Sequence, residues 1–157
     1  MSWSDFNTKK DISKVVYAFK FYFEIEGRRH FFHVYIWKDL ESFLVNTLLP
    51  KDDKAYGLCR CSPIMLDYCD GVETRHFYPK LGEIHFVVGE WDSEIISHEV
   101  EHASCCIHGH YRDRLRRIME GENEVEEEHC YIIGKMAREI YLKLWAVSPN
   151  KKWEKKQ

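Results

Sequence analysis

Apolar residues in the first third of the chain fall into two dense runs separated by a polar turn. Residues 15–25 read VVYAFKFYFEI and residues 30–37 read HFFHVYIW, and both runs are rich in the β-branched and aromatic residues that favour strands. Glu26 and Gly27 interrupt the pattern where a turn is needed. The pattern therefore predicts a β-hairpin that turns at residues 27–29.

The spacing of apolar residues changes after this hairpin. Between residues 38 and 49 they recur three and four positions apart, which predicts a helix that Pro50 stops. Residues 51–79 are less regular: residues 55–62 favour a strand, residues 76–78 favour a second short one, and the remainder reads as loop. The glycine-bounded run GEIHFVVG at residues 82–89 predicts another short strand.

Helical spacing dominates the second half of the chain. Asp92 or Ser93 can cap a helix that carries an apolar stripe and ends near Gly109. Residues 110–119 predict a further turn of helix, and a last helix is expected from about residue 125 to 145. This order of elements predicts an α+β fold in which a small, mainly antiparallel sheet packs on the two long helices.

Composition and charge narrow the class of protein. A chain of 157 residues with 45% hydrophobic residues suits one domain, which we expect over residues 1–148, followed by a basic solvated tail at 149–157. The net charge of -3 gives no electrostatic reason to expect a nucleic-acid or membrane partner. The first residues lack the apolar core of a secretory signal, which predicts a cytoplasmic location.

Six cysteines are present, and a cytoplasmic location predicts that they are free thiols. Cys59, Cys61 and Cys69, together with His76, could form a zinc site. However, the spacing C-x-C-x7-C fits none of the usual structural zinc patterns. Small buried hydrophobic residues are therefore the favoured interpretation of these cysteines.

The most specific chemistry lies in residues 98–102, which read HEVEH and match the HExxH pattern of zinc hydrolases. His98 and His102 are four residues apart, so a helix places both on one face, where their imidazoles can hold zinc. Glu99 then fits as the general base that activates a zinc-bound water. Without a metal, the same residues would be polar positions on the outer face of an amphipathic helix.

A catalytic zinc normally takes three protein ligands, and two sources for the third are open. His108 is the sixth residue after His102, as in the pattern HExxHxxGxxH, but Cys105 occupies the place of the turn-forming glycine. The other source is the acidic run at the start of the last helix. Helical phase alone does not separate its three members, Glu126, Glu127 and Glu128.

The stretch EIISHEVEHA followed by EEEHCYIIGKMAREI resembles small single-domain metallopeptidase-like proteins of phage and other mobile elements, which are zincins of the gluzincin type. Cys130, Tyr131 and Gly134 match the small, aromatic and glycine positions of that pattern, which makes Glu127 the implied third ligand. Tyr131 stands where thermolysin-like enzymes carry an aspartate. A phenol there could orient a histidine or donate to the oxyanion.

The residues and the resemblance together predict a zinc-dependent hydrolase of the metallopeptidase class, with one Zn2+ per chain and a peptide or protein substrate. The strand at residues 83–88 is expected to offer its edge to an extended peptide. The alternative is a catalytically silent zinc-binding interaction or regulatory module with a zincin fold, such as a host-interaction protein of a mobile element. Neither cleavage specificity nor oligomeric state is indicated by the sequence.

Overall fold

The computed structural model describes residues 9–148, so the expected basic tail lies outside the described residues. The fold is α+β, as the pattern of elements predicted. Its elements follow in chain order: η1 (Ile12–Lys14), β1 (Val15–Ile25), β2 (Arg28–Trp37), α2 (Leu40–Thr47), β3 (Gly57–Cys61), β4 (Met65–Cys69), β5 (Val72–His76), β6 (Lys80–Val87), α3 (Ser93–His110), α4 (Arg112–Met119) and α5 (Asn123–Val147).

The main sheet has four strands in the order β1-β2-β6-β3. The predicted hairpin is confirmed, because β1 and β2 pair antiparallel around the turn at Glu26 and Gly27. β2 and β6 run parallel, whereas β3 and β6 are antiparallel. The expectation that residues 83–88 form an exposed edge is wrong: β6 is an inner strand, and its residues from Leu81 to Val87 are buried. The free edge on this side belongs to β3.

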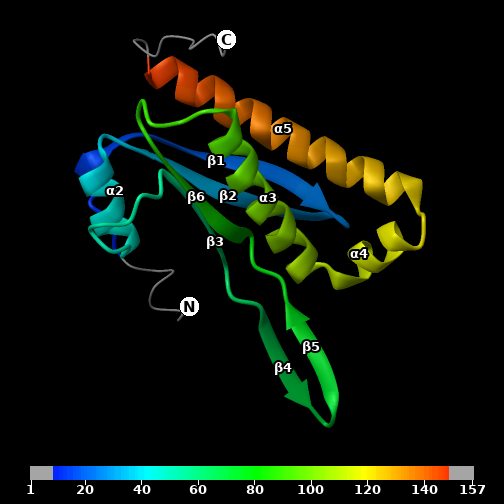
Figure 1. Cartoon of the computed structure of the whole chain (residues 1–157). Coiled ribbons are helices and arrows are strands. Elements are labelled where there is room, and N and C mark those ends of the chain that lie inside the picture. The colour runs from blue at the N-terminus through cyan, green and yellow to red at the C-terminus, as the bar shows by residue number, and fades with distance from the viewer. Residues whose placement is uncertain (1–8, 149–157) are drawn as a thin grey trace.

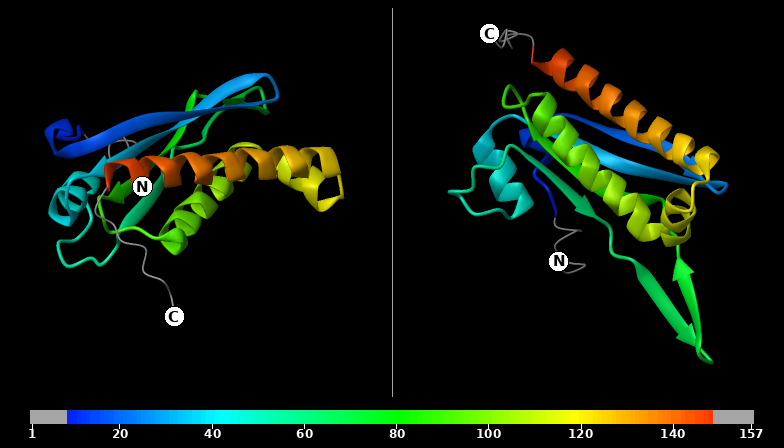
Figure 2. Two further views of the ribbon diagram at one scale, coloured as in Figure 1. Left: turned by 90° about the horizontal axis from the view of Figure 1, so that it is seen from above. Right: turned by 45° about the vertical axis from the view of Figure 1, so that its right-hand side comes forward.

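Helices α3 and α5 lie side by side over one face of the sheet (Figure 1 and Figure 2). The Asp92 carboxylate caps α3 by accepting a 2.8 Å hydrogen bond from the Ile95 amide, as predicted. The core between the layers contains large apolar side chains from all three elements. These are Phe21, Phe32, Val34, Ile84 and Phe86 of the sheet, Ile96, Val100, Ala103 and Ile107 of α3, and Ile132, Met136, Ile140 and Leu144 of α5.

The opposite face of the sheet carries α2 and a buried polar chain. Trp37 Nε1 donates to His85 Nδ1 at 3.0 Å, which leaves the hydrogen of the imidazole on Nε2, 3.5 Å from Glu83. Lys10 and Lys80 also contact the Glu83 carboxylate, at 2.8 and 2.9 Å. Burial alone would raise the pKa of Glu83, but the hydrogen bonds from His85 and Lys10 and the charge of Lys80 together hold it well below its ordinary value.

A hairpin of β4 and β5 projects from the body of the molecule between β3 and β6 (Figure 1). Residues 65–76 were expected to be mostly loop, with a short strand near residue 76, so this hairpin is a correction. Its turn is Asp70-Gly71, and both residues have positive φ angles, 50° and 76°, as a tight hairpin turn requires. Cys69 lies exposed on this hairpin, and His76 pairs there with Asp67, so neither joins Cys59 and Cys61 in a zinc site.

The cysteines include one covalent link between the sheet and α3. Cys61 on β3 and Cys106 on α3 form a disulfide with their Cα atoms 5.6 Å apart. The expectation that all six cysteines are free is therefore wrong for this pair. The other four, Cys59, Cys69, Cys105 and Cys130, are free thiols.

Candidate functional site

The two histidines of the HExxH motif lie on the outward face of α3. His98 Nε2 and His102 Nε2 are 3.2 Å apart, and both side chains are exposed. Two imidazole nitrogens that bind one tetrahedral zinc at about 2.0–2.1 Å would be about 3.3 Å apart. The pair is therefore already at the separation that a shared metal requires. A shallow depression around it is lined only by residues of α3: Glu94, Ser97, His98, Glu101, His102 and Cys105.

Glu99 points from the same helix toward the edge strand β3. Its side chain is buried, accepts a hydrogen bond from the backbone N–H of Cys59, and leaves Oε2 without a hydrogen-bond partner in the structure. Burial raises the pKa of this carboxyl, and the charges of His98 and His102 and the bond from Cys59 offset part of the rise. A carboxylate with a raised pKa is a better proton acceptor near neutral pH than an exposed one.

The position of Glu99 depends on a close approach between β3 and α3 at Gly57. A Cβ atom at residue 57 would lie 2.9 Å from Glu99 Cγ, 3.1 Å from Glu99 Oε1 and 3.1 Å from a methyl carbon of Ile95. A Cβ atom would fit here only if the Glu99 or Ile95 side chain, the helix or the strand shifted. Glycine lets β3 lie this close to the carboxyl group without such a shift.

We predict that Gly57→Ala destabilises the fold by about 1–3 kcal/mol, because the added methyl overpacks the β3–α3 contact. Urea unfolding would measure the change. Gly134→Ala is the matched control: that glycine is exposed on α5 with nothing within 4 Å of an added Cβ, so it should gain about 0.5–1 kcal/mol of helix propensity. Equal stability of the Gly57→Ala and parent proteins would show that the added methyl is accommodated and that the β3–α3 contact does not depend on glycine.

The third ligand implied by the resemblance, Glu127, does not join the two histidines in this structure. Val125 and His129 are on the buried side of α5. Glu127 lies midway between them in the sequence, so the helical period places it on the opposite, exposed side of the helix. His129 contacts Ser104 Oγ at 2.8 Å, so residues before it lie beside the C-terminal part of α3. His98 and His102 lie further back along that helix.

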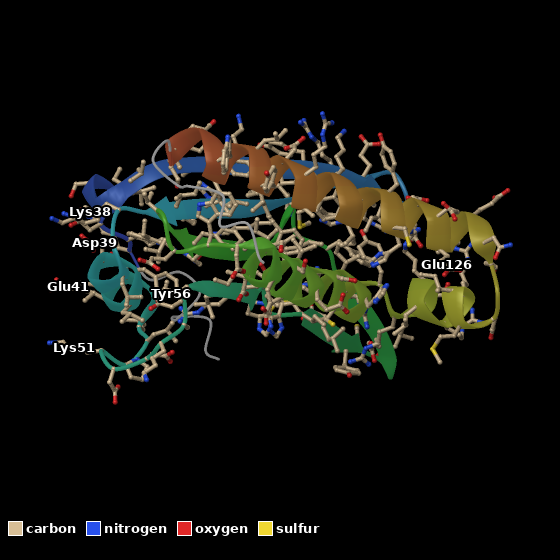
Figure 3. The ribbon with its side chains drawn as sticks, turned by 45° about the horizontal axis from the view of Figure 1, so that its top comes forward. Lys38, Asp39, Glu41, Lys51, Tyr56 and Glu126 are labelled. Carbon is tan, nitrogen blue, oxygen red and sulfur yellow. A yellow bond between two sulfur atoms is a disulfide. The ribbon has the colours of Figure 1, made fainter. Side chains whose placement is uncertain are left out.

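The other candidates for the third ligand are also held elsewhere. Glu126 lies at the N-terminal end of α5 beside α4 (Figure 3), and Glu128 is 3.6 Å from Arg114 of that helix. His108 continues along α3, as expected without a glycine at residue 105, and its ring stacks on His129 at 4.1 Å. None of the residues predicted from the sequence therefore lies where it could serve as the third protein ligand of a zinc held by His98 and His102.

The expected oxyanion donor is likewise not brought to the motif by any contact in the structure. Tyr131 is 70% exposed on α5, where the Lys135 ammonium lies 6.0 Å from its ring centroid. Tyr111, the next tyrosine along the chain from the motif, is buried at the far end of α3, and its hydroxyl hydrogen-bonds His30 Nε2 at 2.5 Å.

A second group of metal-type side chains was not foreseen from the sequence. Within residues 9–148, the one set of three such residues whose ligand atoms all lie within 4.8 Å of each other is Cys61, Cys106 and His110. The sequence carries a weak signal for two of its three members, because Cys106 and His110 are four residues apart on one helix. Cys61 lies 45 residues earlier, and only the packing of β3 on α3 reveals it.

The chain matches no protein-family model, no curated protein and no solved structure. Within residues 9–148, none of the helices combines the length and the apolar character that a membrane crossing requires.

Proposed function

We propose that this protein is a zinc-dependent hydrolase that acts on peptides, with the site centred on the exposed face of α3. The observation that carries the proposal is the convergence of His98 Nε2 and His102 Nε2 to 3.2 Å, together with the buried carboxyl of the adjacent residue Glu99, whose Oε2 has no hydrogen-bond partner. This separation fits a hydrogen bond between the two imidazoles, and it is also the separation that a shared zinc would require. A buried carboxyl directly after the first histidine is what favours a hydrolytic site over two polar residues that face solvent.

The side chains of the motif can fill two of the four ligand positions of a zinc ion. His98 and His102 would hold the metal through neutral imidazole nitrogens, and zinc supplies a bound water of lowered pKa and a Lewis acid for the substrate carbonyl. Among residues 9–148 the structure places no third protein ligand within reach, so that position would be left to solvent or to the substrate. Glu99 holds the proton that the reaction removes and returns it to the leaving amine.

The free edge of β3 supports a peptide as the substrate. β3 is the last strand of its sheet, and its inner neighbour β6 satisfies only one side of its backbone. An extended peptide can pair with the outer side as an added strand. Because Gly57 and Cys59 of β3 contact Glu99, such a peptide would lie across the face that carries the motif.

Zinc binding tests the site directly. For the protein with its Cys61–Cys106 disulfide intact, we expect close to one Zn2+ per chain. We expect His98→Ala to weaken this binding by more than the roughly 10–100-fold that loss of a supporting residue causes. Isothermal titration calorimetry with zinc alone measures both. His76→Ala is the matched control, because that histidine is partly exposed on the β4–β5 hairpin and should bind no metal of this site. Equal loss in both variants would rule out the motif as the metal site.

The same titration decides the third ligand. On the observed geometry, Glu127→Ala and His108→Ala both keep the zinc affinity of the parent, because neither side chain approaches the histidine pair. Loss of affinity in Glu127→Ala alone would restore the ligand set implied by the gluzincin resemblance. It would also require α5 to rotate about its axis when metal binds.

The incomplete ligand set favours one second candidate, a zinc-binding interaction module without catalysis. Such a module would bind zinc as strongly as a hydrolase and would not depend on the carboxylate of Glu99. Incubating the zinc-loaded protein with a mixture of unstructured peptides, followed by mass spectrometry, separates the two functions. New peptide termini that disappear with a chelator support the hydrolase, and intact peptides support the module.

A further inference from the structure

We infer that Cys61, Cys106 and His110 form a second zinc site that exists only when the Cys61–Cys106 disulfide is reduced. The site is separate from the HExxH pair, and its ligand atoms all lie within 4.8 Å of each other. Two sulfurs and one imidazole nitrogen from this set match a Cys2His zinc site that keeps one open position.

His110 is prepared as a ligand by its own hydrogen bond. Its Nε2 lies 3.1 Å from the carbonyl oxygen of Ser62, an acceptor only, so Nε2 carries the hydrogen and donates it. Nδ1 is then an unprotonated nitrogen, and it is buried without any hydrogen-bond partner. Metal-bound histidines characteristically donate their other ring N–H to a backbone carbonyl in this way.

A buried acceptor without a partner normally destabilises a protein, so the orphaned Nδ1 calls for an explanation. His110 is only 1% exposed. It lies one helical turn after Cys106 on the same inward face of α3, and Cys61 approaches from β3 opposite. A metal ion bound at this point would satisfy Nδ1 and join the sheet to the helix where the disulfide now joins them.

The disulfide and the metal exclude each other, because both use the same two sulfur atoms. A dithiol reductant supplies two electrons and two protons to the Cys61–Cys106 bond, giving two thiols and the oxidised cyclic disulfide of the reductant. Zinc then binds both sulfurs as thiolates and releases the two protons to solvent. A disulfide oxidant reverses the step: it takes two electrons from the two thiolates and two protons from solvent, leaves as two thiols, and the metal is released as the Cys61–Cys106 bond forms. The β3–α3 link is therefore covalent in one redox state and metal-mediated in the other.

Cobalt is the probe that distinguishes this site from the HExxH pair, because only thiolate ligands give a sulfur-to-cobalt charge-transfer band. The chain carrying His98→Ala and His102→Ala is reduced with dithiothreitol, freed of reductant without oxygen, and titrated with Co2+ alone. We expect one equivalent of Co2+ with this band in the reduced protein and no band in the oxidised protein. Failure of the hydrolase proposal would not affect this result, since the variant lacks that site.

Cys106→Ser should abolish the band, and His110→Gln should weaken Co2+ binding at least tenfold. Cys105→Ser is the matched control, because the adjacent thiol is exposed and free and its loss should change nothing. Circular dichroism follows folding throughout. The inference is overturned by a folded, reduced chain without the band, by the same band in Cys106→Ser, or by a reduced chain that unfolds and is not refolded by Co2+.

Discussion

Replacing Glu99 with glutamine is expected to abolish peptide hydrolysis while zinc binding and the fold are retained. Glutamine keeps the size of the side chain and can still accept the hydrogen bond from the Cys59 N–H, but it cannot take a proton. Loss of a general base typically lowers the rate by about 10²–10⁴-fold. The measurement is the initial rate of peptide cleavage at saturating zinc, with metal content determined on the same samples.

The control for Glu99→Gln is Glu94→Gln, which removes an exposed carboxylate from the depression around the histidine pair. That variant should cleave at the parental rate. If Glu99→Gln also cleaved at the parental rate, the base would have to be another group. Glu101, on the same exposed face of α3, would be the next candidate.

Although Glu99→Gln is expected to remove activity, it is expected to raise stability at neutral and higher pH. The reason is that burial raises the pKa of Glu99 in the folded protein. A group whose folded pKa lies above its unfolded value stabilises the protein most below the unfolded pKa, about 4.3 for glutamate. That stability is lost as pH rises through the folded pKa. Glu99→Gln should therefore melt higher than the parent at pH 8, with the difference disappearing below about pH 4.

Local elements could be predicted from the sequence because their signals are local. Helix α3 follows from the Asp92 cap and an apolar stripe, and the β1–β2 hairpin follows from two apolar runs around Gly27. Strand order is not a local property. β6 is an inner strand because the short strand β3 pairs with the edge that β2 leaves free. The Asp70-Gly71 turn was a local signal for the β4–β5 hairpin, but the polar residues around it read as loop.

The residues of the candidate site also divide into those that local sequence predicts and those that it does not. His98, Glu99 and His102 could be named from one helical turn of sequence, and the structure gives them a consistent geometry. Glu127 came from a resemblance, whereas the apolar residues Val125, Ile132 and Met136 already define the buried side of α5. When the helical period of these three residues is extended along α5, Glu127 falls on the side that faces away from the core. A phase argument over the whole helix would have separated it from a metal-facing position.

The disulfide was out of reach of the sequence for a different reason. The expectation of free thiols rested on the apparent absence of a secretory signal, which concerns location and not geometry. Cys61 and Cys106 meet because β3 packs against α3, and this packing also places Gly57 against Glu99. The disulfide thus holds β3 against α3 near the proposed base. Its Cys61 lies two residues after Cys59, whose backbone N–H hydrogen-bonds Glu99.

Breaking this link is expected to lower the free energy of unfolding by about 4 kcal/mol, the chain-entropy estimate for a disulfide that closes a loop of 45 residues. Urea unfolding of the oxidised and reduced protein with a chelator present measures the change, and the Cys61→Ala/Cys106→Ala variant should resemble the reduced parent. A Cys105→Ala variant tests for a general effect of cysteine removal and should unfold like the parent.

An unchanged midpoint on reduction would mean that β3 and α3 hold together without the bond. If zinc replaces the disulfide as inferred, adding it to the reduced protein at about 100 times its Kd should return about 2.7 kcal/mol, since a ligand that binds only the folded state stabilises that state. The cysteine variant should gain nothing at this site. The difference between the two proteins therefore isolates the contribution of the thiolates from any zinc bound by His98 and His102.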